Sequence, residues 1–152
     1  IYVSRYDRRC GQEGRVAEMS TIHCRIMTPH GVYKEMDTEI INIETNEGQR
    51  GILPEHMPLV TMLKVGKMST IENGQREEYA VSGGMFYFRE NKAEILTDAI
   101  EGKSEIDLER AIAAKERAER RLAQKKPNLD VQRAEIALAR ALNRISVYGK
   151  QI

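Results

Sequence analysis

The sequence predicts an N-terminal antiparallel β-sandwich followed by a C-terminal antiparallel hairpin of two α-helices. Three observations favour this fold class. Apolar and polar residues alternate from Ser20 to Thr97, glycine and proline become rare after Gly102, and the helical composition beyond it is interrupted once, at Pro127. Alternation with a period of two indicates strands, whereas Ala, Glu, Arg and Leu favour helices. The expected parts are a leader at 1–18, the sandwich at 19–102, the helical hairpin at 103–149 and a tail at 150–152.

The first 18 residues have no clear period, and regular alternation begins directly after Met19. We expect Met19 to be the natural start of the chain and the leader to be non-native or disordered.

The strands of the sandwich follow from alternation and from the turn residues between them. Asn73-Gly74 suits the type I′ turn of a tight hairpin, and we expect Leu59–Val65 to be a buried run. The GILPEHMP loop at 51–58 is expected to be a proline-punctuated turn that leaves Ile52, Leu53 and Leu59 buried. Other expected core positions are Ile22, Cys24, Ile26, Ile41 and Ile43.

The two helices follow from capping and breaking signals. Ser104 or Asp107 can cap the first helix, Pro127 with Asn128 breaks the helical pattern and can open the second, and Gly149 ends the second. Each helix would have about 20 residues and be about 30 Å long. The expected seam is Ala111, Ala114, Ala118 and Leu122 against Val131, Ala134, Leu138, Ala141 or Leu142, and Ile145. Alanine buries little apolar surface, so this seam should stabilise the closed hairpin only modestly.

Charge and composition limit the function classes. Residues 1–102 carry 12 basic and 16 acidic side chains, a charge of −4, whereas residues 103–152 carry 12 and 7, a charge of +5. The tail therefore favours an anionic partner. No apolar stretch approaches the roughly 20 residues of a membrane-spanning helix, and Cys10 and Cys24 have no disulfide-framework spacing. We expect a cytoplasmic protein without a transmembrane segment.

Four arginines should meet when the hairpin folds. Arg110 and Arg117 share one face of the first helix, and Arg140 and Arg144 share one face of the second. A turn centred near Pro127 places Arg110 level with Arg144 and Arg117 within a turn of Arg140. Guanidinium groups bind phosphate oxygens in bidentate fashion, so a triphosphate would suit this cluster. The alternative, a solvated basic face, remains open from periodicity alone.

The sequence does not favour a metal site, a catalytic site or a nucleic-acid-binding function. His23, His30 and His56 lack metal-ligand spacing, and the sequence contains neither a GxxxxGK[ST] loop nor a recognisable nucleophile arrangement. A nucleic-acid partner is not expected, because the body is acidic and no aromatic platform accompanies the basic tail. We expect no catalysis by this chain alone and no metal site.

Several motifs resemble the epsilon subunit of ATP synthase. They are GILPEHMPLVTML at 51–63, VSGGMFYF at 81–88 and ILTDAIE at 95–101, while Ile106 to Ala111 is similar to the I(L)DxxRA motif of ATP-binding epsilon subunits from bacilli. By this resemblance, the residues expected to contact ATP are Glu101, Ile106, Asp107, Arg110, Ala111, Arg117, Arg140 and Arg144. ATP would be a regulatory ligand, with its Mg²⁺ requirement left open. Three positions depart from the family pattern: Glu55 replaces glycine, Met85 replaces phenylalanine, and Pro127 shortens or stiffens the link between the helices.

The resemblance implies a rotor subunit of a bacterial, proton-translocating F-type ATP synthase. The sandwich would dock on the gamma subunit and the c ring at the cytoplasmic face of the plasma membrane, as a peripheral component. The hairpin would stay closed with ATP and, once extended, would contact the alpha/beta catalytic head and inhibit ATP hydrolysis. The alternative is a purely structural rotor subunit whose basic arm binds an acidic protein segment without sensing ATP.

Overall fold

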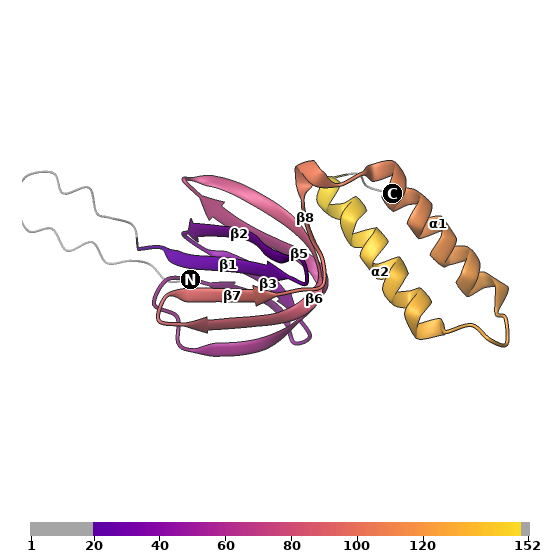
Figure 1. The fold of residues 1–152 in the computed structure, drawn as a ribbon, viewed down its shortest axis with the longest axis horizontal. Coiled ribbons are helices and arrows are strands. Elements are labelled where there is room, and N and C mark those ends of the chain that lie inside the picture. The colour runs from indigo at the N-terminus through magenta and orange to yellow at the C-terminus, as the bar shows by residue number, and fades with distance from the viewer. Residues whose placement is uncertain (1–19, 150–152) are drawn as a thin grey trace, which may run out of the picture.

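A computed structural model describes residues 20–149, which form a β-sandwich and a helical hairpin docked at one end of it (Figure 1). The predictions about the leader, Met19 and the tail lie outside the described residues. The strands are β1 (Ile22–Thr28), β2 (Gly31–Thr38), β3 (Ile41–Thr45), β4 (Gly48–Ile52), β5 (Leu59–Glu72), β6 (Gln75–Arg89), β7 (Lys92–Leu96) and β8 (Ile100–Gly102). A 3-10 turn, η1 (Lys103–Glu105), leads to helices α1 (Leu108–Gln124) and α2 (Val131–Tyr148).

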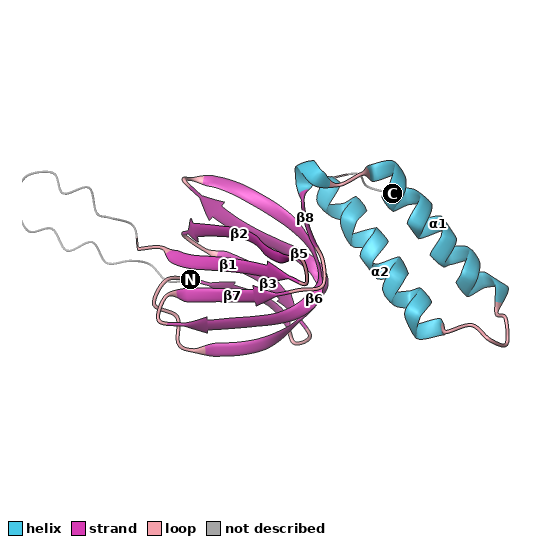
Figure 2. Cartoon of the chain, viewed as in Figure 1, coloured by secondary structure: helices cyan, strands magenta, loops and turns pink. Residues whose placement is uncertain are grey.

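Within residues 20–149, the strands form a sheet that folds over on itself, which confirms the predicted sandwich (Figure 2). The strand order is β2-β1-β7-β6-β5-β3-β4, and β8 pairs with β6. The pairings among the described strands are antiparallel with one exception, because β1 and β7 run parallel. A parallel pair needs a long return of the chain, so no local turn signal marks it in the sequence.

The long hairpin of β5 and β6 contributes to both layers of the sandwich because it bends at Gly83 and Gly84. Both glycines have positive φ, 88° and 128°. A Cβ atom on Gly84 would lie 2.0 Å from the carbonyl oxygen of Leu96, so only glycine fits there. Beyond the bend β6 pairs with β7, and before it β6 pairs with β8. At the other end of this hairpin, Asn73 and Gly74 both have positive φ, as a type I′ turn requires.

The core between the layers is mostly aliphatic and includes both phenylalanines, Phe86 and Phe88, which are fully buried. The predicted inward positions of β1 and β3 are confirmed as buried: Ile22, Cys24, Ile26, Ile41 and Ile43.

The prediction of a buried run at 59–65 was wrong. β5 alternates, so Val60 and Met62 are 60% and 56% exposed on its outer face while Leu63 is buried. Leu53 is also exposed, contrary to expectation, because the chain leaves β4 at Ile52, which is buried. The same loop holds Glu55 at a φ of 64°, with its backbone N–H donating a hydrogen bond to Asn91.

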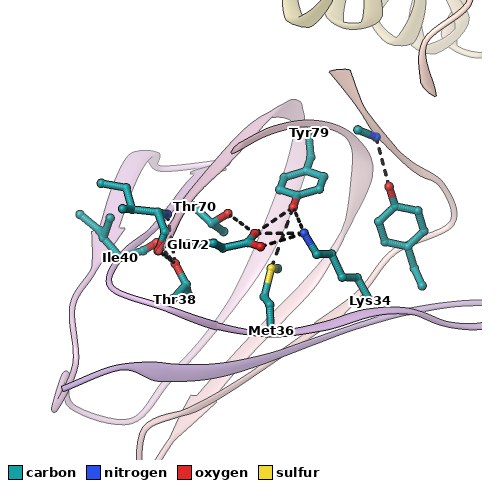
Figure 3. Close-up of polar contacts among 10 residues, drawn as sticks. Lys34, Met36, Thr38, Ile40, Thr70, Glu72 and Tyr79 are labelled. Carbon is teal, nitrogen blue, oxygen red and sulfur yellow. Dashed lines mark hydrogen bonds and ion pairs between the residues drawn. The ribbon is translucent and has the colours of Figure 1, made fainter. Parts of the chain in front are cut away.

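A polar network ties β2 to the ends of β5 and β6 (Figure 3). The Lys34 ammonium donates to a carboxylate oxygen of Glu72 at 2.9 Å and to the Tyr79 hydroxyl at 2.7 Å. Burial raises the pKa of Glu72, but hydrogen bonds from Lys34, Thr70 and Tyr79 outweigh that effect and lower it overall. The network therefore holds an ionised carboxylate where the two layers meet.

The predicted helix signals are confirmed except at the start of α2, which begins at Val131 rather than at Pro127 with Asn128, because Asp130 supplies its cap. Asp107, rather than Ser104, caps α1 by accepting from the Arg110 N–H at 3.0 Å, and Asp130 caps α2 in the same way through Arg133. Gly149 ends α2 at a φ of 96°. No helix within residues 20–149 is long and apolar enough to cross a membrane.

Alanines form the seam between α1 and α2, as predicted. The buried seam residues are Ala111, Ala118, Ala134, Ala141 and Ile145. The choice left open between Ala141 and Leu142 falls on Ala141, because Leu142 is 43% exposed. Val131 was assigned to the buried seam wrongly: at the first position of α2 its side chain is 50% exposed.

Helix α2 packs against β5 and β6, and α1 lies on its far side (Figure 1). The apolar part of this contact is a small cluster of Ala80, Ile106 and Val147. Figure 2 shows the consequence: α2 lies between the sheet and α1. Ala111 and Ala118 are the buried residues of α1, and most of its other residues are exposed.

Candidate functional site

A cavity of about 330 Å³ opens where the end of β8, the N-terminal half of α1 and the C-terminal part of α2 meet. Its size falls within the range of small-molecule pockets, roughly 300–1,000 Å³. The residues that line it are Glu101, Glu105, Asp107, Arg110, Ala111, Ala114, Arg117 and Arg144. The structure therefore brings together six of the eight residues predicted to contact a nucleotide.

One ion pair crosses the cavity from the sandwich to the hairpin. The Arg144 Nε atom donates to a carboxylate oxygen of Glu101 at 2.7 Å, and both side chains are about one third exposed, 30% and 36%. The pair aligns α2 with the end of β8. Its exposure lets an anion compete with the Glu101 carboxylate for the Arg144 guanidinium group.

Arg140 lies outside the lining of this cavity. Its Nη2 atom is 4.0 Å from a carboxylate oxygen of Asp98, which precedes β8. The Nε atom of Arg140 is buried and has no hydrogen-bond partner among the described residues. A buried guanidinium N–H without a partner costs free energy, so this group is suited to an added acceptor.

Residues of the I(L)DxxRA motif, predicted to contact ATP, have structural roles in the fold. Ile106 is buried against Ala80 and Val147 rather than exposed to the cavity, and it anchors the start of α1 to the sandwich. Asp107 lines the cavity and also caps α1. Ala111 is buried at the seam, where a larger side chain would push the helices apart.

Two further residues of this region were missed from the sequence. Glu105 lines the cavity, accepts from the Gly102 N–H at 2.7 Å and also accepts a hydrogen bond from the Tyr33 hydroxyl. Burial and the hydrogen bond to Glu105 raise the pKa of Tyr33. Glu105 lies directly before the recognised motif and could have been suspected, but nothing in the sequence links Tyr33, 72 residues away, to this turn.

The cavity thus combines three guanidinium groups with three carboxylates. Arg110, Arg117 and Arg144 can bind phosphate oxygens, and carboxylates can accept hydrogen bonds from hydroxyl or amino groups. Only a ligand with an anionic part and a polar part would match both kinds of group. A nucleotide has this combination.

Known protein families match both parts of the chain. The model of the family "ATP synthase, Delta/Epsilon chain, beta-sandwich domain" matches residues 21–103, and that of "ATP synthase, Delta/Epsilon chain, long alpha-helix domain" matches residues 104–149. The ATP synthase epsilon chain of Halalkalibacterium halodurans is 45% identical over 133 residues, which cover 87% of this chain and 100% of that protein. The epsilon chain of Bacillus velezensis is 44% identical, covering 86% of this chain and 99% of the relative.

Solved structures show the same fold in distant proteins. A chain of the Euglena gracilis mitochondrial ATP synthase, from a structure of its OSCP, F1 and c-ring, superposes with a TM-score of 0.74 at 24% identity, covering 92% of this chain and 91% of the other. A chain of the Tetrahymena thermophila mitochondrial ATP synthase central stalk and c-ring gives a TM-score of 0.52 at 15% identity, covering 87% and 96%. Together, the two family models and the close bacterial relatives show that this chain belongs to the family of epsilon subunits of bacterial F-type ATP synthases.

Proposed function

We propose that this chain is a non-catalytic, central-stalk subunit of the proton-translocating ATP synthase, and that its C-terminal hairpin binds ATP as a regulatory ligand. The observation that carries the nucleotide part is the cavity, in which Glu101, Asp107 and three arginines from both helices face one space. Separate elements of the chain supply these side chains, so ligand binding would hold the hairpin closed.

The proposed regulation is a change between a docked and an extended hairpin. The apolar contact between hairpin and sandwich is small, and the seam between the helices is mostly alanine. Little apolar area is lost when the hairpin opens, so a ligand can shift this equilibrium. Free ligand at about 100 times its dissociation constant adds about 2.7 kcal/mol to the docked form. The extended helices would reach the alpha/beta catalytic head and inhibit ATP hydrolysis.

The sandwich offers a surface for the other proposed partners, the gamma subunit and the c ring. Five apolar residues occupy the outer face of β5, β6 and β7, where register pairs Val60 with Tyr87 and aligns Met62, Met85 and Leu96 in one row. They are 38% to 60% exposed. A contiguous apolar surface of this kind is typical of a protein interface. Binding there would hold the subunit at the cytoplasmic face of the plasma membrane as a peripheral component.

A second candidate is a structural subunit whose basic arm does not sense ATP. The ion pairs of Arg144 with Glu101 and of Arg140 with Asp98 favour it, because they neutralise two of the arginines without a ligand. The partner of the arm would then be an acidic protein segment.

Isothermal titration of the full chain with ATP separates the two candidates. We expect a saturable heat with one site, and at least about tenfold weaker binding after Arg117→Ala or Arg144→Ala, because both side chains line the cavity and charge-assisted hydrogen bonds are worth about 1.5–3 kcal/mol. Arg120→Ala is the matched control, since Arg120 lies on the same helix but outside the cavity lining. Absence of both heat and a melting shift at millimolar ATP would rule out nucleotide sensing and leave the structural role intact.

A further inference from the structure

A side chain outside the nucleotide cavity joins the hairpin to the sandwich. The Asn143 amide nitrogen, on α2, donates to the carbonyl oxygen of Gly66 at 2.9 Å and to that of Val81 at 3.4 Å. Gly66 and Val81 face each other across β5 and β6, the central strand pair of the sheet. One amide therefore contacts both strands at the same level. A carbonyl oxygen has two lone pairs, so it can accept this donor in addition to a bond in the sheet.

Asn143 lies on the face of α2 that packs against the sandwich. Arg140, Asn143, Arg144 and Val147 have the spacing of one helix face, and this face meets the sandwich. Two members of the face form ion pairs with exposed or half-exposed carboxylates, and Val147 packs on Ile106 and Ala80. Asn143 makes the contact to the main chain, which cannot move away as a side chain can.

We propose that Asn143 is the positioning residue that docks the hairpin on the sandwich, and that its amide sets the equilibrium between docked and undocked forms independently of any ligand. The link from this equilibrium to inhibition of ATP hydrolysis rests on the function proposed above. The role of Asn143 in docking the hairpin does not depend on that function. In the docked form the amide exchanges water for two fixed acceptors, and in the undocked form it returns to water. Its contribution belongs to the docked state alone.

The rate at which a buried thiol reacts measures this equilibrium. Ala80 is 5% exposed and lies under α2, so Ala80→Cys would react with a thiol reagent only when the hairpin undocks. When closing is faster than labelling, the observed rate is proportional to the undocked fraction. Cys24 is an internal control: it is buried in the sandwich, where burial raises the pKa of its thiol to about 12, so it reports opening of the sandwich itself. Cys10→Ser removes the remaining thiol.

In this background we expect Asn143→Ala to accelerate labelling at residue 80 about fivefold to tenfold, since a net hydrogen bond of about 1 kcal/mol corresponds to about fivefold. Alanine is a better helix former than asparagine, so the change does not weaken α2 itself. Asn143→Asp should accelerate labelling further, because a carboxylate would face two carbonyl oxygens. Asn128→Ala, in the exposed loop between the helices, is the matched control and should change nothing.

Unchanged labelling at residue 80 in the Asn143 variants would overturn the proposal. Equal acceleration of labelling at Cys24 would also overturn it, because Asn143 would then stabilise the whole sandwich and not the docked hairpin specifically. Adding ATP tests this proposal and the nucleotide function separately. If ATP does not slow labelling at residue 80 in the parent chain, the nucleotide-sensing proposal is contradicted. The labelling rates of the parent chain and the Asn143 variants, compared without ATP, still decide whether Asn143 docks the hairpin.

Discussion

At the scale of residues, the Glu72 carboxylate joins β2 to β5 and β6 through its hydrogen bonds with Lys34 and Tyr79. Glu72 is 18% exposed, accepts from Lys34 and Tyr79, and sits where β2 approaches β5. Its pKa is lowered overall, since the hydrogen bonds to the ionised form outweigh burial. Ionised Glu72 therefore contributes to the free energy of unfolding by an amount that depends on pH.

We predict that Glu72→Gln lowers the free energy of unfolding by about 1–3 kcal/mol at pH 7. Because the folded-state pKa of Glu72 lies below its unfolded value of about 4.3, the contribution is complete above that pH and is lost as pH falls through the folded pKa. Urea unfolding at a series of pH values should therefore show the variant and the parent converging in acid. Glu94→Gln, on the exposed side of β7, is the control. A pH-independent difference would contradict the argument.

The backbone at Glu55 has the left-handed conformation, with a φ of 64°. Left-handed backbone costs a residue with a side chain about 1–2 kcal/mol, whereas glycine adopts it freely but loses more chain entropy on folding. We predict that Glu55→Gly raises the free energy of unfolding by up to about 1 kcal/mol. Glu94→Gly, in a regular strand, should lower it. A loss of stability at residue 55 as well would show that the Glu55 side chain makes a contribution larger than the strain.

At the scale of elements, the caps of α1 and α2 are built alike but have different surroundings. Asp107 and Asp130 each accept a backbone hydrogen bond at 3.0 Å, yet only Asp107 lines the cavity. The two caps therefore form a natural pair of variants.

We predict that Asp107→Ala and Asp130→Ala each lower the helix stability by about 1 kcal/mol, as cap removal usually does. Thermal melting followed by circular dichroism measures this loss. Only the change at Asp107 should also weaken ATP binding directly, and Asp107→Asn should restore the cap without restoring the carboxylate. If Asp130→Ala weakened binding as much as Asp107→Ala, the effect of Asp107 would be that of a cap alone.

At the scale of the whole molecule, the surface proposed to bind a partner and the cavity proposed to bind ATP lie in different parts of the protein. The basic hairpin and its cavity lie at one end of the sandwich, while the apolar outer face of β5, β6 and β7 belongs to the sandwich itself. The two proposed kinds of binding should therefore be separable by mutation.

We predict that Met62→Lys weakens binding to the gamma subunit at least about tenfold while leaving the fold and ATP binding unchanged, because a charge would be buried at the interface. Co-purification with gamma, or its titration, measures the effect. Val32→Lys, an exposed apolar residue on β2, is the matched control. Loss of binding in both variants, or in neither, would argue against this face.

Much of this protein was determined by its sequence alone. Alternation predicted the buried positions of β1 and β3, and terminal signals predicted the start of α1 and the end of α2, because these patterns depend on contacts near in the chain. Helical periodicity and the family resemblance together selected the side chains that meet at the cavity. Only the tertiary structure decided the parallel pairing of β1 with β7, the exposed face at Val60 and the docking contact of Asn143. Each of these depends on which distant segment lies alongside, and that is fixed by packing of the whole chain rather than by local preference.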